Sequence, residues 1–232
     1  MITDTRQNSV ALDILKSFLE KYEAGGVFSE YKVKTLLKEL GLPVPRGIVV
    51  QKNQAIPDLS ALKYPLVAKI SSTKITSKSN VGGVRTGVQT KEDLESVVPK
   101  LMRIEDVDEV YVEEMAPAGF ELIIGGMIDG QFGPVVMLGL GGIFVEFFRD
   151  ITFALAPLAR EEALDFVKSF KAYKLFEGYR GRPALDITAL LKVIVVVSEL
   201  MATGRISEID LNPVALYPNG AMILDAKMKL NP

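Results

Sequence analysis

The order of apolar and polar positions predicts several amphipathic helices along the chain. Residues 10–22 carry apolar side chains at the three- and four-residue spacing of one helix face. Ser29 is a favourable N-cap for a second helix that continues to Leu40, and Gly41 stands where a glycine commonly ends a helix. Similar patterns predict three further helices, at residues 91–103, 161–170 and 186–202.

Between these helices, alternating or continuous apolar runs predict β-strands. The expected strands are 47–50, 64–71, 84–88, 110–115, 121–128, 135–138, 206–211 and 222–226. Asp129-Gly130 predicts a hairpin turn, residues 139–142 a glycine-rich turn, and Pro218-Asn219-Gly220 a third turn. Because helices and strands are mixed without an internal repeat, we expect an α+β fold.

A break at Pro117 and Gly119 divides this pattern into two lobes. We therefore expect an N-terminal helical segment at 1–26, an N-terminal lobe at 27–115 and a C-terminal lobe at 116–232. A chain of 232 residues is long enough to bury a core in each lobe.

Composition removes several functional classes. The net charge is −2 and no basic run occurs, so the chain shows no nucleic-acid footprint. It has no cysteine, which excludes disulfides and thiol nucleophiles, and no histidine, which excludes a phosphohistidine of its own. The N-terminus lacks a secretory signal, and charged residues interrupt the most apolar segment, 187–201, which is short for a membrane span. We predict a cytoplasmic protein with no membrane partner.

Lys69 is the first position with candidate chemistry, because it interrupts an apolar strand. Burying an ammonium group without a partner is costly. Two interpretations follow: Lys69 lies on an edge strand with its head in water, or it points at phosphate oxygens in a cleft.

Residues 77–84, SKSNVGGV, form the second candidate. Gly82 and Gly83 allow the backbone to approach an anion, and successive N–H groups can surround a phosphate. The order of a Walker A motif is missing, and a Gly-Gly pair is more often only a turn.

Carboxylates at two further places are candidates. Glu113 and Glu114 end a strand at the expected lobe boundary, where they are either solvated surface groups or part of a nucleotide-binding hinge. Later in the chain, Glu208, Asp210 and Asn212 share one face of a strand by alternation. That face is either exposed to solvent or chemically active.

The strand that returns after the Pro218-Asn219-Gly220 turn contains Asp225. If the two strands pair, Asp225 lies near Asn212. A carboxylate and an amide oxygen together make a hard oxygen site suited to Mg²⁺ shared with substrate phosphates.

Five stretches carry a resemblance to a known family: SKSNVGGV, VEEMAPAGFELIIGG, QFGPVVMLGLGGIFVE, GYRGRPALD and EIDLNPVALYPNGAMILDA. Together they resemble the ATP-grasp fold, and within it the β subunits of ADP-forming acyl-CoA (acetyl-CoA) synthetases, relatives of succinyl-CoA synthetase. The resemblance runs from about Ser29 to Leu230. It implies two lobes with a nucleotide cleft between them.

The resemblance also implies which residues bind the nucleotide. They are Lys69, Gly82, Gly83, Glu113, Glu114, Met115 and Glu121. Lys69 matches the lysine that contacts the phosphates, and the two glycines match a loop that closes over them. The three residues from Glu113 match the adenine-facing hinge, and a carboxylate nearby holds the ribose.

For catalysis, the resemblance implies that Asn212 and Asp225 are Mg²⁺ ligands and that Asp210 receives an incoming phosphohistidine, with Lys69 neutralising phosphate charge. The implied reaction is acyl-CoA + ADP + phosphate ⇌ acid + ATP + CoA. The phosphohistidine belongs to a separate CoA-binding α subunit, in an α2β2 heterotetramer. A chain without histidine agrees with that division.

Two departures from the family pattern stand out. Many relatives have a histidine at the position of Ser77, so a second phosphoryl relay at this position is excluded here, and transfer would run directly from the partner's histidine. Relatives also commonly carry a basic residue near Ala154. Either loss is also consistent with a subunit that has lost its activity.

Two alternatives remain: a stand-alone ATP-grasp carboxylate–amine ligase, or a non-catalytic ATP-binding subunit. No acceptor-binding domain is evident, which argues against the first. The acyl group cannot be identified from this chain, because its pocket is expected on the partner.

Overall fold

The computed structural model describes residues 4–21, 26–75, 77–142 and 150–231. They form two compact units. The smaller unit comprises residues 28–32 and 45–117, and the larger unit contains the other described residues. These units differ from the contiguous lobes that we expected, because residues 33–44 pack with the C-terminal part of the chain.

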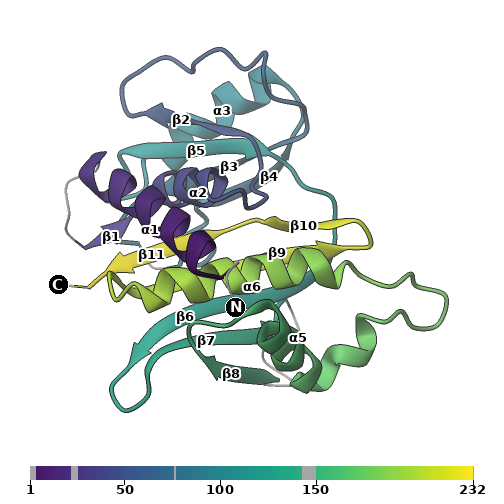
Figure 1. Cartoon of the computed structure of the whole chain (residues 1–232). Helices are drawn as coiled ribbons and strands as arrows, with labels where there is room; N and C mark the ends of the chain where they lie inside the picture. The colour runs from purple at the N-terminus through teal and green to yellow at the C-terminus, as the bar shows by residue number, and fades with distance from the viewer. Residues whose placement is uncertain (1–3, 22–25, 76, 143–149, 232) are drawn as a thin grey trace. The chain divides into compact units, whose positions relative to one another are not determined.

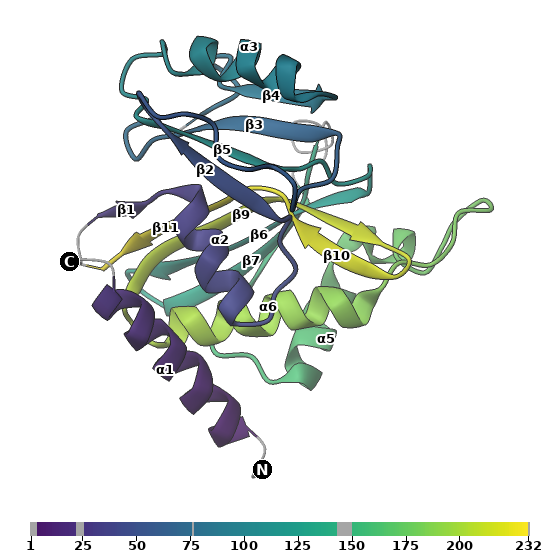
Figure 2. The ribbon, with the colours of Figure 1, turned by 90° about the horizontal axis from the view of Figure 1, so that it is seen from above.

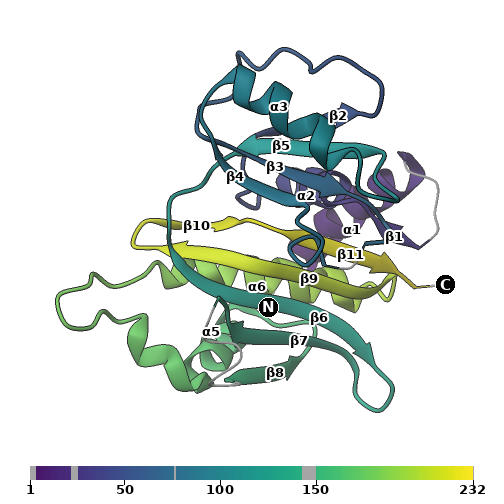
Figure 3. The ribbon, with the colours of Figure 1, turned by 180° about the vertical axis from the view of Figure 1, so that it is seen from behind.

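The smaller unit is built on a four-stranded antiparallel sheet in the order β2-β5-β3-β4. Its strands are β2 (Gly47–Gln51), β3 (Leu66–Ser71), β4 (Val84–Val88) and β5 (Glu109–Glu114). Helix α3 (Lys91–Leu101) covers one face of this sheet (Figure 3). Apolar side chains of α3 and of the strands form the core of the unit, among them Leu66, Ala68, Ile70 and Leu94.

The larger unit is built on a seven-stranded sheet in the order β1-β11-β9-β6-β7-β8, with β10 paired to β9. The bounds of the strands are β1 Val27–Phe28, β6 Phe120–Asp129, β7 Gly133–Leu140, β8 Ile151–Leu155, β9 Ile206–Tyr217, β10 Gly220–Ile223 and β11 Ala226–Leu230. The pairings of β9 with β6, β10 and β11, of β6 with β7 and of β7 with β8 are all antiparallel. β9 is the longest strand, and it pairs with β6, β10 and β11.

Four α-helices and a short 3-10 helix complete the described chain. They are α1 (Asp4–Lys21), α2 (Glu30–Glu39), α5 (Arg160–Ser169), η1 (Lys171–Leu175) and α6 (Ile187–Ala202). Within the larger unit, α6 lies along one face of the sheet and contacts α1 and α5 (Figure 1). In the view from behind, none of the helices formed by the described residues covers the opposite face of β6, β7 and β9 (Figure 3).

The apolar segment predicted as a buried helix is α6. The Asp186 side chain caps its N-terminus by accepting a hydrogen bond from the N–H of Ala189, at 3.0 Å. Most of its apolar side chains are buried, as are Ser198 and the neighbouring Leu158. Ser198 has a structural role, since its hydroxyl accepts from the Leu158 N–H and donates to the Val195 carbonyl. No helix in the described part of the chain is both long and apolar enough to cross a membrane.

The expected helices and most of the expected strands are confirmed, with differences at their ends. Gly139 belongs to β7 and not to a turn, because its backbone pairs with Ile123 on one side and Ile151 on the other. The single strand expected at 222–226 is two strands, β10 and β11 (Figure 2). Strand β8 was not predicted, since residues 151–155 alternate too weakly. Residues 143–146, the end of one family stretch, lie outside the described residues.

Candidate functional site

Alternation along β3 and β5 divides their side chains between two faces of the smaller sheet. Leu66, Ala68 and Ile70 belong to the apolar core on the α3 side. The intervening Lys69 therefore points to the opposite face. The same argument places Tyr111 on that face, because it is paired with Lys69 in the register of the two strands.

Lys69 is held by two carboxylates on this face. Its Nζ lies 2.9 Å from Oε1 of Glu30, at the start of α2, and 2.6 Å from Oε1 of Glu113 on β5. All three side chains are buried, and Lys69 is only 7% exposed. Because β3 lies between β5 and β4, the edge-strand interpretation of Lys69 is wrong. The ammonium group avoids the cost of an unpaired buried charge through these two partners.

The Tyr111 hydroxyl joins the same group by a hydrogen bond to Glu113. Burial, together with the Glu113 and Glu30 carboxylates, raises the pKa of Tyr111 far above its ordinary value. The phenol therefore stays neutral. Its ring packs at a 5.7 Å centroid distance from Tyr31 and lies so close to Gly47 that a side chain there would collide with it. The Tyr111 ring is therefore held in a fixed position beside the cluster.

Gly82 and Gly83 lie in a turn that is hydrogen-bonded to β3 and is closed by a hydrogen bond within the turn. The Ile70 N–H donates to the Gly83 carbonyl at 2.8 Å, next to Lys69, and the Gly83 N–H donates to the Lys78 carbonyl at 2.7 Å. Gly82 has a φ of 65°, in the left-handed region that favours glycine. The turn directs Lys78 inward, and its Nζ lies 2.5 Å from Oε2 of Glu30.

A methyl group at position 83 is expected to disturb this turn. A Cβ there would collide with Cδ1 of Ile70 and would lie 3.0 Å from the Lys78 carbonyl oxygen. We expect Gly83→Ala to cost roughly 1–3 kcal/mol of stability, the usual range for overpacking. Urea unfolding measures it. Gly130→Ala is the control, since nothing lies within 4 Å of a Cβ at that turn position, and an equal effect in the two variants would contradict the packing argument.

The expected hinge residues end β5. The Glu114 carboxylate accepts from Arg46 Nη2 at 2.7 Å and from the Lys63 N–H at 2.8 Å. The N–H groups of Glu114 and Met115 donate to the carbonyls of Arg46 and Pro65. Both N–H groups are therefore engaged within the smaller unit, so a purine edge at this hinge would have to use other groups.

Glu121 lies at the start of β6 in the larger unit, where it is exposed. Its carbonyl accepts from the Gly141 N–H at 2.8 Å. A Cβ at Gly141 would collide with the backbone of Glu121, and Gly142 has a φ of 61°, in the left-handed region, so glycine is favoured at both positions. Burial, with a contribution from the Glu121 carboxylate, raises the pKa of the nearby Tyr217 hydroxyl. Glu121 is thus anchored through its backbone while its carboxylate remains accessible.

Asp210 lies on β9 with the alternation that the sequence predicts. Ile209 and Leu211 are buried, whereas Glu208 and Asn212 are exposed and Asp210 is half-buried. Asp210 pairs with Gly125 of β6, and both contribute to a small pocket of about 150 Å³. The lack of a side chain at Gly125 leaves room above the strand beside the Asp210 carboxylate.

Asn212 and Asp225 are neighbours, as expected from the returning strand. The N–H of Asn212, on β9, donates to the carbonyl of Asp225 at 3.2 Å. Asp225 lies between the end of β10 and the start of β11. Oδ1 of Asp225 accepts from the Ala226 N–H at 2.8 Å, which fixes the carboxylate. The described residues contain no group of three or more His, Cys, Asp or Glu that could hold a metal. Two hard oxygen ligands fit Mg²⁺ only if phosphates and water complete its shell, which is its usual mode of binding.

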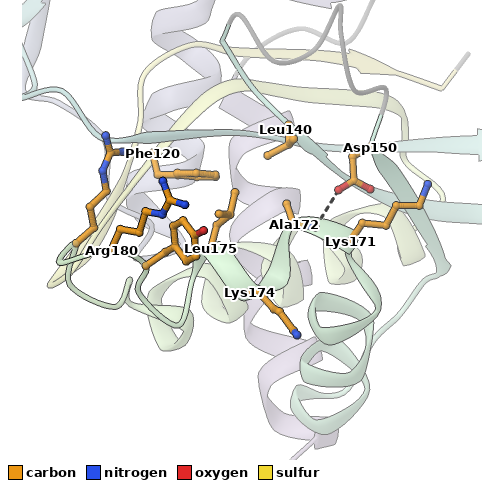
Figure 4. Close-up of a pocket in the computed structure, with 10 residues that line it drawn as sticks. Phe120, Leu140, Asp150, Lys171, Ala172, Lys174, Leu175 and Arg180 are labelled. Atoms are coloured by element: carbon orange, nitrogen blue, oxygen red, sulfur yellow. Dashed lines mark hydrogen bonds between the residues drawn. The ribbon is translucent and has the colours of Figure 1, made fainter.

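A larger cavity of about 840 Å³ lies elsewhere in the larger unit (Figure 4). Phe120, Leu140 and other apolar side chains line it together with basic ones, including Arg180. Asp150 also lines it, and its Oδ2 accepts from the Ala172 N–H at 3.0 Å. Among the described residues that line this cavity, none is a site residue that we predicted.

Sequence reasoning missed two members of the cluster around Lys69. Glu30 reads as an ordinary acidic residue in the first turn of a helix, and Tyr111 reads as part of a buried strand. Lys78 belongs to the SKSNVGGV stretch but was not among the predicted site residues. Of these three residues, only Lys78 had a sequence signal for a role in the site, because it lies in a glycine-containing stretch that could bind phosphate.

Comparison with known proteins agrees with this architecture. The model of a family described as "ATP-grasp domain" matches residues 21–230. The chain belongs to the ATP-grasp family. The fold and family expected from the sequence are therefore confirmed.

Among relatives of this ATP-grasp chain, the β subunit of an ADP-forming acetate–CoA ligase I from Pyrococcus furiosus is 38% identical over 210 residues, 87% of this chain and 90% of the relative. Other relatives are longer proteins of which this chain spans about 30%. A succinate–CoA ligase β subunit from Anaplasma marginale is more distant, at 24% over 214 residues, 86% of this chain and 55% of the relative.

Solved structures of acetyl-coenzyme A synthetase 1 from Ca. Korarchaeum cryptofilum share the fold. One complex with coenzyme A and Ca-AMPCP has a TM-score of 0.83 at 34% identity, covering 95% of this chain and 100% of that chain. Another holds coenzyme A and Mg-AMPPCP with its phosphohistidine segment towards the nucleotide site, with a TM-score of 0.78 at 36% identity and the same coverage. The relatives are thus acid–thiol ligases of the ADP-forming class, as expected.

Proposed function

We propose that this chain is the nucleotide-binding subunit of an ADP-forming acyl-CoA synthetase. In that reaction it transfers a phosphoryl group from a phosphohistidine of a CoA-binding α subunit to ADP. The observation that carries this proposal is the position of Lys69. This buried lysine lies next to Ile70, whose N–H donates to the Gly83 carbonyl of the glycine turn. The chain is an ATP-grasp chain and contains no histidine. The acetate–CoA ligase relatives support the reaction class.

In the smaller unit, Lys69 and the Gly82-Gly83 turn would bind the phosphates of ADP. The ammonium group neutralises phosphate charge, and backbone N–H groups of a glycine turn approach phosphate oxygens closely. The hinge at Glu113, Glu114 and Met115 would face the adenine. Catalysis then consists of positioning and charge neutralisation, the main contributions of proteins to phosphoryl transfer.

In the larger unit, Asn212 and Asp225 would hold Mg²⁺, and Glu121 would hold the ribose. The ion would neutralise charge on the transferring phosphates. The fixed Asp225 carboxylate and the adjacent Asn212 supply the oxygen ligands that Mg²⁺ prefers. A solved relative that contains Mg-AMPPCP supports this choice of metal.

Asp210 would orient the partner's histidine and stabilise its positive charge. In the forward step a β-phosphate oxygen of ADP would form a bond to phosphorus as the P–N bond of the phosphohistidine breaks. The electron pair of the P–N bond stays on that nitrogen, so a ring protonated on its other nitrogen, held by Asp210, leaves as neutral imidazole. Transfer is direct, because Ser77 would form a phosphoester too stable to pass its phosphoryl group to ADP quickly. The 150 Å³ pocket beside Asp210 is where the imidazole would enter.

The surface around Asp210 suits a partner subunit. Met127 and Phe153 line its pocket and are exposed, and Ile151, Phe132 and Leu155 are exposed on the neighbouring strands and turn. Exposed apolar groups gathered in this way commonly mark a protein interface. Ala154 on β8 alternates with Phe153 and Leu155 and pairs with the buried Val136, so it lies on the opposite face of the strand from this surface. The α2β2 assembly and the cytoplasmic location stay predictions.

The first test is isothermal titration of the full chain with ADP and ATP, with and without Mg²⁺. We expect binding that Mg²⁺ strengthens. A candidate α subunit, phosphorylated on its histidine with ³²P, is then mixed with the chain and ADP, and we expect labelled ATP to appear. A folded chain that binds nucleotide but yields no ATP with its partner would contradict the transfer reaction and favour a non-catalytic ATP-binding subunit.

A further inference from the structure

One carboxylate in the smaller unit is shared by two lysines that come from different segments. Oε1 of Glu30 lies 2.9 Å from Nζ of Lys69, and Oε2 lies 2.5 Å from Nζ of Lys78. Lys69 belongs to β3, whereas Lys78 belongs to the glycine turn that follows it. All three residues are less than 10% exposed. The two ammonium groups are therefore fixed close together, one on each oxygen of the carboxylate.

Two ammonium groups held on one carboxylate could each contact one phosphate group of a diphosphate. Two like charges inside a protein repel each other, and they persist together only where anions lie near both. Here the Glu30 and Glu113 carboxylates lie beside the two ammonium groups. Lys78 is also bonded through its backbone carbonyl to Gly83, so it is positioned by the same turn that would approach the phosphates.

We infer that Lys78 is a second phosphate-binding lysine of the nucleotide site and that Glu30 is the positioning residue that holds it beside Lys69. This inference rests on the proposed function and deepens it. Lys69 and Lys78 would contact neighbouring phosphate groups of ADP. Glu30 stays on the opposite side of the two ammonium groups and keeps them from separating.

The test compares ADP with adenosine in isothermal titration of the full chain. Lys78→Gln removes the charge and is expected to weaken ADP binding about tenfold to a hundredfold, the size of one charge-assisted hydrogen bond. Adenosine has no phosphate, so its affinity should not change. Lys74→Gln is the matched control: it lies four residues earlier, is exposed, and pairs with Asp106 on the surface.

Glu30→Gln keeps the length of the side chain and removes its charge. An amide oxygen accepts more weakly from an ammonium group, and the two lysines then repel each other without compensation. We expect ADP binding to weaken about threefold to tenfold, again without a change for adenosine. A variant with a purely structural defect would lose affinity for both ligands.

The outcomes separate the hypotheses. A wild-type chain that binds no ADP would overturn the proposed function and the assignment of Lys78 with it. A wild-type chain that binds ADP, with Lys78→Gln binding equally well, would overturn the role of Lys78 alone. Tighter ADP binding by Glu30→Gln would show that Glu30 competes with the phosphates and would overturn its positioning role. Circular dichroism checks each fold, and Lys78→Met replaces a Gln variant that does not fold.

Discussion

Replacing Lys69 by methionine is expected to abolish ADP binding and to lower stability by roughly 3–5 kcal/mol. Methionine keeps the aliphatic stem, so the packing on the face of β3 changes little. The ammonium group is lost, however, and the buried Glu113 and Glu30 carboxylates lose a shared partner. The same removal takes away the charge that would neutralise the nucleotide phosphates. Stability and binding should therefore fall together.

Urea unfolding and isothermal titration measure the two effects separately. Lys74→Met is the control, because its ion pair with Asp106 is solvent-exposed and should contribute at most about 1 kcal/mol. A Lys69→Met variant with wild-type stability would mean that the two carboxylates do not depend on this lysine. A folded variant that still binds ADP with wild-type affinity would remove Lys69 from the phosphate site.

Replacing Asp225 by asparagine is expected to reduce phosphoryl transfer about 100-fold or more while leaving the fold intact. Partners that merely support a metal ligand already contribute about 10- to 100-fold. Asparagine retains an oxygen that can accept the hydrogen bond from the Ala226 N–H, so the junction of β10 and β11 persists. What is lost is the negative charge that would hold Mg²⁺ beside Asn212.

Formation of labelled ATP in the complex, measured over a range of Mg²⁺ concentrations, tests this expectation. The variant should need more Mg²⁺ and should reach a lower rate. Glu161→Gln removes one carboxylate charge from the exposed first turn of α5 and should behave as wild type. An Asp225→Asn variant with an unchanged Mg²⁺ dependence would exclude Asp225 as a ligand.

Features that depend on neighbours in the sequence were predictable. The alternation of β9 placed Asp210 and Asn212 on one face, and the turn at residues 218–220 brought Asp225 back to Asn212. Local spacing is sufficient there because a hairpin joins residues that are close along the chain. The family stretches were recognised for the same reason, since each is a continuous run of residues.

The environment of Lys69 was decided only by the tertiary structure. From the sequence, an edge strand with the lysine in water was as plausible as a phosphate site. The strand order β2-β5-β3-β4 makes β3 internal, which no local pattern states. The Glu30 partner lies 39 residues away from Lys69 and 48 from Lys78, at the start of a helix.

By itself, therefore, the sequence determined the helices and most of the strands, the faces on which polar residues lie, and the ATP-grasp family. The tertiary structure decided which charges meet, and grouped residues 33–44 with the C-terminal part of the chain. The physical reason is that periodicity sets the direction of a side chain relative to its own backbone. The partner that it finds depends on sheet order and helix packing, which arise from contacts between distant segments.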